Sequence, residues 1–303
     1  MSPAPLIFDR KLIRARQRRA QRRHPATFLL DRVAEDFRDR IGAVLRHFDI
    51  AVDLGTPGDQ VAEVLGDSGK AGRVIRARTP VPPLHGVMAV VADEEALPFR
   101  DGSLDLVVSA LALHAVNDLP GTLLQIRRAL KPDGLFLAAL FGGDTLSELR
   151  QSFAAAESEM EGGVSPRVAP FPDLRDLGAL LQRAGFALPV SDVERITVRY
   201  ASVPALMEDL RAMGATNALI ERRRVPLRRD TLLRMMEIYG RRFVDADGRL
   251  RATFEIVWLS GWAPHESQQK PLPPGSAKAR LADALGVKEI PASERTGRGA
   301  RSI

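Results

Sequence analysis

The chain has 303 residues, of which 45% are hydrophobic and 27% are charged, and it contains no cysteine. This length and apolar content allow a sizeable buried core. The lack of cysteine excludes disulfides, thiol catalysis and cysteine-bound zinc, and the five histidines show no metal-ligand spacing. No apolar stretch approaches the roughly 20 residues that span a bilayer. These features predict a soluble, intracellular globular protein without a metal site of its own.

The net charge of +6 is concentrated at the two ends of the chain. Residues 10–23 contain eight Lys or Arg and no acid, and residues 270–303 contain seven Lys or Arg and three acids. The sequence between them is mildly acidic, so no nucleic acid is expected as a partner. Three interpretations of the basic N-terminus stay open: an organellar transit peptide, a patch that contacts lipid headgroups or an acidic partner, and a solvated helix. The second predicts peripheral membrane contact.

Apolar periodicity predicts a helix at residues 28–48, followed by an alternation of strands and helices. Runs rich in β-branched residues predict strands at 50–54, 73–77, 87–91, 104–109 and 135–141, with helices at 60–65 and 119–130. The second half is predicted to contain helices at 145–161, 172–184, 204–213 and 230–242 and strands at 193–200 and 251–262. This order predicts a parallel α/β sheet, on which ligands bind beyond the carboxyl ends of the strands.

The predicted elements divide the chain into three parts. They are a basic N-terminal helical segment at 1–48, an α/β domain at 49–265 with a helical insertion at about 144–245, and a loosely ordered basic tail at 266–303. The segment 141–171 and the helices at 204–242 are expected to cover the strand ends and to form a protein-substrate surface. Glu157, Glu159 and Glu161 in that segment would suit a basic side chain such as arginine. The alternative is an ordinary surface helix with solvated acids.

Polar segments that follow three strands are predicted to meet at one end of the sheet. Their candidate binding residues are Asp53, Gly55, Thr56 and Gly58 after the first strand, Asp93 and Glu94 after the third, and Ser109 at the end of the fourth. Glycine at a strand-to-helix turn lets the backbone approach a ligand, and an acid there can accept hydrogen bonds from an amino group or a ribose. A plain tight turn is the alternative for the first segment.

Two further side chains are candidates for the chemistry of the site. His114 follows the fourth strand and Asp144 follows the fifth, so both can face the same cleft. A histidine that titrates near neutral pH can act as a general base. The alternatives are a His114 that is hydrogen-bonded in a packed loop and an Asp144 that caps the next helix. Asn117 and Asp118 are expected to cap the helix at 119–130.

The succession of the motifs DxG, ADEEALPF, GSLDLVVS and LKPDGLFLA resembles class I S-adenosylmethionine-dependent methyltransferases of the methyltransferase-11 type. The resemblance implies a Rossmann-like sheet, mostly parallel with antiparallel last strands, plus a helical insertion. It also implies S-adenosylmethionine as cofactor, with Asp53 and Gly55 against its methionine end. Asp93, with Glu94 beside it, would meet the adenine amino group.

Further motifs narrow the resemblance to the complex I assembly factor 5 family and its bacterial relatives, over roughly residues 8–285. These motifs are FDRKL (8–12), LHAVNDLPGTLLQIRRALKPDG (113–134), FGGDTLSELR (141–150), AESEMEGGVSPRVAPF (156–171), LMEDLRAMGATNA (206–218) and GWAPHESQ (261–268). The sequence departs from the methyltransferase pattern at Pro57 and Asp59, where glycine is usual, and at residues 76–80, where the acid that holds the ribose is missing. Each lost charge-assisted bond is worth about 1.5–3 kcal/mol, so weakened cofactor binding is expected.

The resemblance implies a methyltransferase-like protein that modifies a protein side chain during assembly of a respiratory complex. Members of this family have been linked to arginine hydroxylation, so the type of reaction stays open. Two alternatives remain: an assembly factor that has lost the cofactor and catalysis, and a small-molecule carboxyl methyltransferase similar to that of biotin synthesis. The expected partner is a protein substrate or a respiratory-complex subunit. The expected location is the bacterial cytoplasm, or the mitochondrial matrix in a eukaryote.

Overall fold

The computed structural model describes residues 6–79, 88–269, 283 and 286. The chain divides into two compact units after His265, and the fold described below is that of the first unit. The predicted tail at 266–303 falls almost entirely outside the described residues. None of the described helices has the length and apolar character that crossing a membrane requires.

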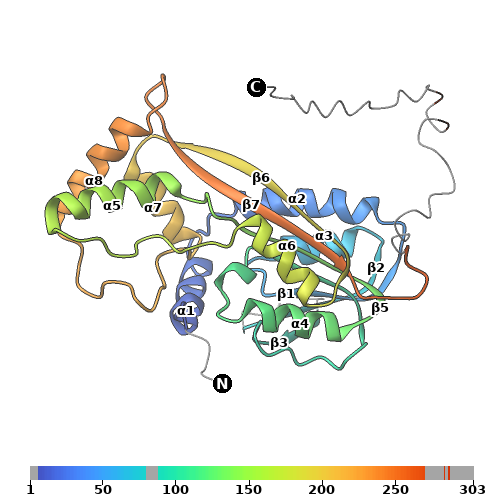
Figure 1. Cartoon of the computed structure of the whole chain (residues 1–303). Helices are drawn as coiled ribbons and strands as arrows, with labels where there is room; N and C mark the ends of the chain where they lie inside the picture. Colours follow the sequence, from blue (N-terminus) through green and yellow to red (C-terminus); the bar gives the residue numbers. More distant parts are fainter. Residues whose placement is uncertain (1–5, 80–87, 270–282, 284–285, 287–303) are drawn as a thin grey trace, which may run out of the picture. The chain divides into compact units, whose positions relative to one another are not determined.

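A seven-stranded sheet with the order β3-β2-β1-β4-β5-β7-β6 forms the centre of the fold (Figure 1). The strands are β1 (Phe48–Leu54), β2 (Ala71–Arg78), β3 (Met88–Val91), β4 (Leu104–Ala110), β5 (Leu130–Phe141), β6 (Ala187–Tyr200) and β7 (Leu250–Trp262). The first five are parallel, β7 is antiparallel to β5, and β6 is antiparallel to β7. This confirms the predicted α/β sheet, mostly parallel with antiparallel last strands.

Helices cover both faces of the parallel strands because successive strand residues point to opposite sides. Leu106 and Val108 of β4 pack with α2 (Phe28–Ala43) and α3 (Gln60–Asp67) in one core. Val107 packs on the other side with α4 (Leu119–Ala129) and α6 (Leu174–Arg183). With both faces buried, β1, β4 and β5 need continuous apolar runs, and this is the pattern that the sequence shows.

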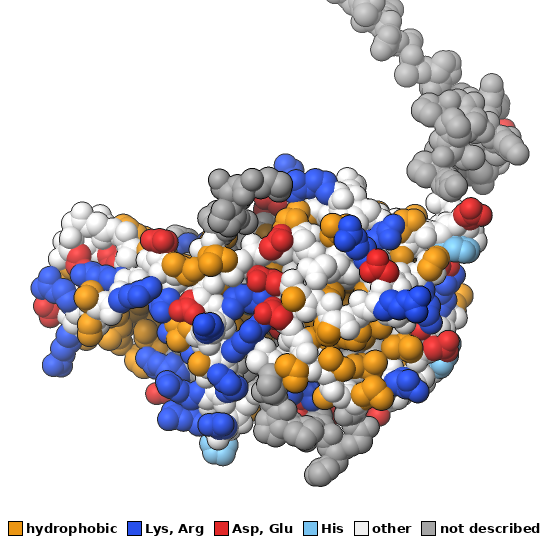
Figure 2. All heavy atoms as spheres, turned by 90° about the horizontal axis from the view of Figure 1, so that it is seen from below, with side chains coloured by type: hydrophobic (Ala, Val, Ile, Leu, Met, Phe, Trp, Pro, Cys, Tyr) orange, Lys and Arg blue, Asp and Glu red, His pale blue; other side chains and the backbone are white. Residues whose placement is uncertain are grey.

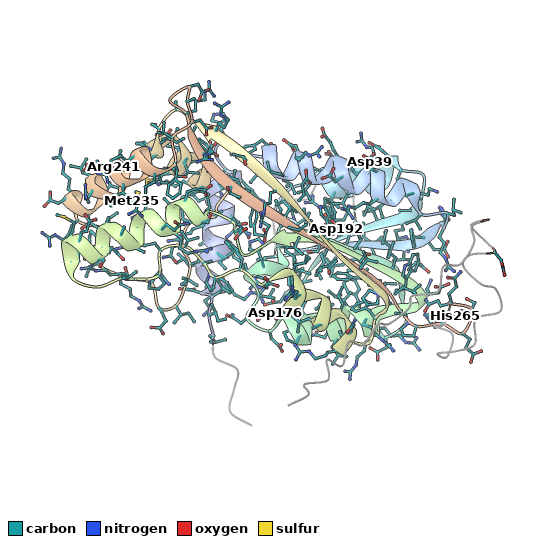
Figure 3. All side chains as sticks on the ribbon, turned by 45° about the horizontal axis from the view of Figure 1, so that its top comes forward. Asp39, Asp176, Asp192, Met235, Arg241 and His265 are labelled. Atoms are coloured by element: carbon teal, nitrogen blue, oxygen red, sulfur yellow. The ribbon has the colours of Figure 1, made fainter. Side chains whose placement is uncertain are left out.

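The helical insertion consists of α5 (Ser147–Glu161), α7 (Val203–Ala212) and α8 (Arg229–Arg242), which pack on one another and on the long β6–β7 pair (Figure 1). Its core includes Leu206, Met235 and Phe254. Arg40 of α2 forms two hydrogen bonds of 2.9 Å with Asp192 of β6, which ties the insertion-bearing strand to the helix layer. Figure 3 shows Met235 on α8 and Asp192 on β6.

Several boundaries differ from the sequence-based expectation. The helix expected at 28–48 ends at Ala43, and Phe48 begins β1, where it pairs with β2. The turn expected at 131–134 lies inside β5, where the pairing with β4 shifts register and Asp133 adopts a positive φ of 65°. Residues 131–134 of β5 lie opposite the single residue Asp105 of β4, so the ladder is interrupted at the turn-like sequence and resumes at Leu135. The edge strand β6 begins at Ala187 instead of 193, because it pairs with β7 along its whole length.

The first helix, α1 (Arg10–Gln21), packs on the compact unit and is not a free basic arm. Phe8 is buried and forms a β-bridge with Leu219, and the N–H of Asp9 donates to the carbonyl of Ala218 at 2.8 Å. The carboxylate of Asp9 caps the helix by accepting from the N–H of Leu12 at 3.0 Å. Figure 2 shows Lys and Arg side chains gathered on the face seen from below. The exposed basic side chains of this segment are Lys11, Arg18, Arg19, Arg22 and Arg23.

Candidate functional site

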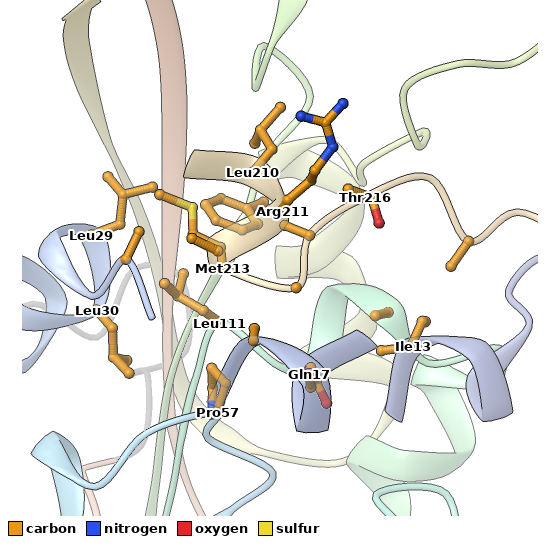
Figure 4. Close-up of a pocket in the computed structure, with 18 of the residues that line it drawn as sticks. Ile13, Gln17, Leu29, Leu30, Pro57, Leu111, Leu210, Arg211, Met213 and Thr216 are labelled. Carbon is orange, nitrogen blue, oxygen red and sulfur yellow. The ribbon is translucent and has the colours of Figure 1, made fainter. Parts of the chain in front are cut away.

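A cavity of about 990 Å³ lies beyond the carboxyl ends of the central strands. It is lined by the turn after β1, the segment after β4, α1, the start of α2 and the end of α7. Figure 4 shows side chains from these elements, among them Gln17, Leu30, Pro57, Leu111 and Met213. This end of an open α/β sheet is where ligands bind, so the cavity is the candidate functional site.

Three of the predicted binding residues form a buried network that joins the ends of β1 and β4. The hydroxyl of Thr56 donates to the Asp53 carboxylate and accepts from the N–H of Ala110 at 3.1 Å. The hydroxyl of Ser109 donates to the carbonyl of Leu54 at 2.8 Å. Burial raises the pKa of Asp53 to about 6. None of the three residues lines the cavity, so their polar groups fix the strand ends in place.

Gly55 and Glu94 lie in direct contact at this end of the sheet. Gly55 has a φ of +74°, and a Cβ added to it would lie 2.8 Å from Cγ of Glu94 and 3.1 Å from Cβ of Ala112. Glycine is therefore required both by the left-handed backbone and by the close approach of these side chains. Gly58 is the one residue of the predicted binding set that lines the cavity itself.

The acids expected at the adenine end are ion-paired with α1. Nη1 of Arg10 lies 2.6 Å from Oδ1 of Asp93 and 2.9 Å from Oε2 of Glu95, and its Nη2 pairs with Glu94. Arg14 lies 2.6 Å from the other oxygen of Asp93. Partial burial would raise the pKa of Asp93, but the hydrogen bonds from Arg14 and the Glu95 N–H, with the charge of Arg10, hold it below its ordinary value. No sequence pattern indicated that α1 reaches these acids.

Two arginines stand where the resemblance implied an acid at the end of β2. Arg78 donates to the carbonyl of Thr56 at 3.1 Å and lies 3.2 Å from the carboxylate of Asp59. Arg76 pairs with the same carboxylate and donates to the carbonyl of Gly58 at 2.6 Å. Because residues two apart in a strand share a face, the Arg-x-Arg pattern and the acid in the turn could have indicated this cluster.

His114 lies in a one-turn 3₁₀ helix (Leu113–Ala115) and lines the cavity. Its ring packs against Phe141 and Phe171, with centroid distances of 4.8 and 5.7 Å. Burial lowers the pKa of His114 to about 4, so the ring is neutral at pH 7. Its Nδ1 is buried and has no hydrogen-bond partner among the described residues. A polar ligand atom in the cavity could supply that partner.

The other candidate residues are placed away from the cavity. The carboxylate of Asp144 pairs with Arg195, and neither residue lines the cavity. Asp118 caps α4 by accepting from the N–H of Gly121 at 2.8 Å. Asn117 has a different role from the expected cap, because its side-chain oxygen accepts from the N–H of Phe8 at 2.7 Å. This contact holds the N-terminal segment beside the site.

The expected acidic surface on α5 does not exist, because the three acids are neutralised by the chain's own residues. Glu157 is buried and pairs with Arg167. Glu159 lies 2.6 Å from Arg234, and Glu161 pairs with Arg223. The cavity wall that α5 does supply is apolar and includes Leu149 and Phe153.

The comparisons with known proteins match this arrangement. A methyltransferase domain model of the methyltransferase-11 type matches residues 53–138. The human protein named arginine-hydroxylase NDUFAF5, mitochondrial, is 42% identical over 304 residues, covering 95% of this chain and 86% of its own length. The chain belongs to the arginine-hydroxylase NDUFAF5 family. This confirms the resemblance to complex I assembly factor 5.

Two other likenesses are more limited in extent or in sequence identity. Malonyl-[acyl-carrier protein] O-methyltransferase of Laribacter hongkongensis is 43% identical over 186 residues, which is 61% of this chain and 60% of that protein. The solved structure of a candidate methyltransferase (BH2331) of Bacillus halodurans has a TM-score of 0.52 at 16% identity. It covers 75% of this chain and 97% of that one, and it supports the class I methyltransferase fold.

S-adenosylmethionine, the cofactor that the methyltransferase domain implies, fits one half of this NDUFAF5-family site as it stands. At the methionine end the cavity reaches Pro57, Gly58 and Ala112 and leaves room beside the turn. At the adenine end Arg10 occupies the carboxylates, and Glu94 reaches from there into the space in front of Gly55, which borders the methionine end. The adenine end therefore fits an adenosyl group only after Arg10 and Glu94 have moved.

Proposed function

We propose that this protein binds S-adenosylmethionine and modifies an arginine side chain of a protein subunit during assembly of a respiratory complex. The observation that carries the proposal is similarity along nearly the whole chain, 42% over 95% of its residues, to a protein named an arginine-hydroxylase. The cavity beyond the strand ends supports the proposal, because it offers room for an arginine side chain and for the methionine end of the cofactor.

The lining of the cavity suits a guanidinium group. Phe141 and Phe171 offer aromatic faces, on which arginine stacks readily. The neutral ring of His114 has an unpartnered Nδ1, which can accept a hydrogen bond from a guanidinium N–H when Nε2 carries the proton. His114 would then bind and orient the substrate.

The cofactor would be held by Gly55 and the turn at its methionine end and by Asp93 at its adenine end. When bound, S-adenosylmethionine supplies a sulfonium-activated methyl group. Arg78 in place of an acid, with Pro57 and Asp59 in the turn, removes groups that would hold the ribose and the methionine end, so affinity is reduced. In a bacterial cell the protein would work in the cytoplasm, where the exposed arginines of α1 would touch an anionic membrane surface.

The direct test is incubation of the purified full chain with S-adenosylmethionine and the candidate respiratory subunit, followed by mass spectrometry of the subunit's arginine peptides. An added methyl group, taken from S-adenosylmethionine, indicates transfer. An added oxygen indicates hydroxylation, for which a parallel incubation contains dioxygen and a two-electron reductant. His114→Ala should abolish the modification, whereas His24→Ala, an exposed histidine after α1, should leave it unchanged. An unmodified subunit under all conditions would contradict the proposal.

The ion pairs at the adenine end favour a second candidate, an assembly factor without catalysis. They satisfy the carboxylates that the adenine would use. If S-adenosylmethionine and S-adenosylhomocysteine both fail to bind at millimolar concentration in calorimetry while the subunit is still captured, the assembly-factor function is supported.

A further inference from the structure

Arg10 is placed by the residues on either side of it. Phe8 is buried against Leu219, and Asp9 caps α1 and pairs with Arg222 at 3.2 Å. These contacts fix the first turn of the helix, so that the side chain of Arg10 points into the loop that follows β3. Only 13% of that side chain is exposed. The FDRKL motif has no part in the proposed activity. Its contacts hold the guanidinium of Arg10 in position.

The acids that receive Arg10 have few acceptor positions left. One oxygen of Asp93 accepts from the N–H of Glu95 at 3.0 Å and lies 2.6 Å from Nη1 of Arg10, and the other oxygen pairs with Arg14. Glu94 is 13% exposed and lies against Gly55. Thus both the hydrogen-bond acceptors and the space that an adenosyl group needs are occupied by the chain itself.

We infer that Arg10 is an autoinhibitory latch: its side chain must release Asp93 and Glu94 before an adenosyl ligand can enter. The inference rests on the proposed binding of S-adenosylmethionine. The ligand's adenine amino group would replace a guanidinium N–H as the donor to Asp93. Glu94, no longer held by Arg10, would then swing away from Gly55.

The release is a side-chain movement, because α1 has other anchors. Asn117 accepts from the N–H groups of Ile7 and Phe8 at 2.8 and 2.7 Å. Farther along the helix, Arg16 donates to the carbonyl of Thr216 at 2.8 Å. Helix α1 therefore stays in place when Arg10 is removed, and Arg10→Ala is expected to fold.

A latch lowers the apparent affinity by the fraction of molecules in which it is open. If Arg10 is released in about one molecule in ten, removing it strengthens binding about tenfold. Salt screens partly exposed ion pairs and opens the latch, so the wild-type affinity should also rise with ionic strength. In Arg10→Ala this rise should be absent.

The experiment is calorimetric titration of the full chain with S-adenosylhomocysteine, which carries no net charge, at low and high salt. Arg10→Ala should bind about tenfold more tightly than wild type and lose the salt dependence. Arg14→Ala, which removes the pairs with Asp93 at 2.6 Å and Glu94 at 3.7 Å but leaves Arg10 in place, should bind a few-fold more tightly. The matched control is Arg19→Ala, an exposed arginine of the same helix, which should bind like wild type.

Equal or weaker binding by a folded Arg10→Ala, or the same salt dependence in wild type and variant, would overturn the latch while leaving the cofactor proposal intact. Absence of binding by every variant at millimolar ligand would overturn both. Circular dichroism of each variant shows that the fold is retained.

Discussion

The carboxylate of Asp59 and the guanidinium of Arg76 form an ion pair across the turn that joins β1 to α3. The side chain of Arg76 is 4% exposed and also donates to the carbonyl of Gly58. The methyltransferase pattern has glycine in this turn and an acid at the end of this strand, whereas here the turn carries an acid and the strand carries a base. The turn is shaped by the protein's own side chains and does not depend on a ligand for its form.

Asp59→Asn should destabilise the protein by about 2 kcal/mol, because it leaves the buried guanidinium of Arg76 without its carboxylate. Urea unfolding measures the change in the free energy of unfolding. Asp101→Asn is the control, since it removes one exposed negative charge that forms no ion pair with another described residue. Equal stability of the two variants would show that the Asp59–Arg76 pair contributes nothing.

Replacing Gly55 should separate the cost of a left-handed backbone from the cost of a close contact. Gly55 has a φ of +74°, and the Cβ of Gly55→Ala would lie 2.8 Å from Cγ of Glu94. Gly69 has a similar φ of +64°, but the Cβ of Gly69→Ala would lie in open space. The Gly69 variant should lose about 1 kcal/mol. The Gly55 variant should lose at least about 1 kcal/mol more, because Glu94 must shift. Similar losses in thermal and urea unfolding would mean that Glu94 moves freely.

Asp53 should make the protein less stable as the pH rises. Burial raises the pKa of this carboxyl in the folded state to about 6, above its ordinary value of 3.8, so the folded state holds the proton more tightly than the unfolded state. The resulting penalty is absent below pH 3.8, grows as the pH rises toward about 6, and then stays constant. Its size is about 3 kcal/mol by linkage.

Asp53→Asn cannot titrate and lacks this penalty. The free energy of unfolding of wild type minus that of Asp53→Asn should therefore fall between about pH 4 and pH 6. Urea unfolding at several pH values measures this difference. A difference that stays constant or rises over this range would show that Asp53 keeps its charge in the folded protein.

His114 should make the protein less stable as the pH falls, which is opposite to the effect of Asp53. Burial depresses its pKa in the folded state to about 4 from 6.5, so protonation favours the unfolded state. The contribution of the neutral His114 ring to the free energy of unfolding is fully present above pH 6.5 and is lost as the pH falls toward about 4. His114→Gln should flatten this loss in urea unfolding, whereas His24→Gln should not. Parallel pH profiles for wild type and His114→Gln would indicate that solvent reaches the ring.

The sheet could be predicted from sequence because its signals are local. Apolar runs at β1, β4 and β5 mark strands with two buried faces, and the motif order adds the antiparallel strands. The positions of Asp53, Asp93 and Ser109 at one sheet end follow from the same rule. What could not be predicted is which partner satisfies each side chain. Arg10 and Glu94 lie 84 residues apart in sequence, and only the packing of α1 brings them together.

The same limit explains the acids of α5. Glu157, Glu159 and Glu161 form an acidic run in the sequence, but their partners Arg167, Arg223 and Arg234 come from the following loop, a distant segment and α8. A charge pattern read along one helix carries no information on which cations fold onto it. Asn117 is a similar case. Its place before a helix predicts a cap, whereas its partner in the structure is the distant Phe8.

The docking of Phe8 also bears on how the chain is made. Its backbone partners are Asn117 and, through the β-bridge, Leu219, so this segment waits for the synthesis of some two hundred further residues before it can bind. Contacts of such long range form late in folding. Until then the exposed arginines and the apolar side chain of the first segment are open to proteases and chaperones. Six of the seven strands, β1 to β6, would thus be synthesised before the site is closed.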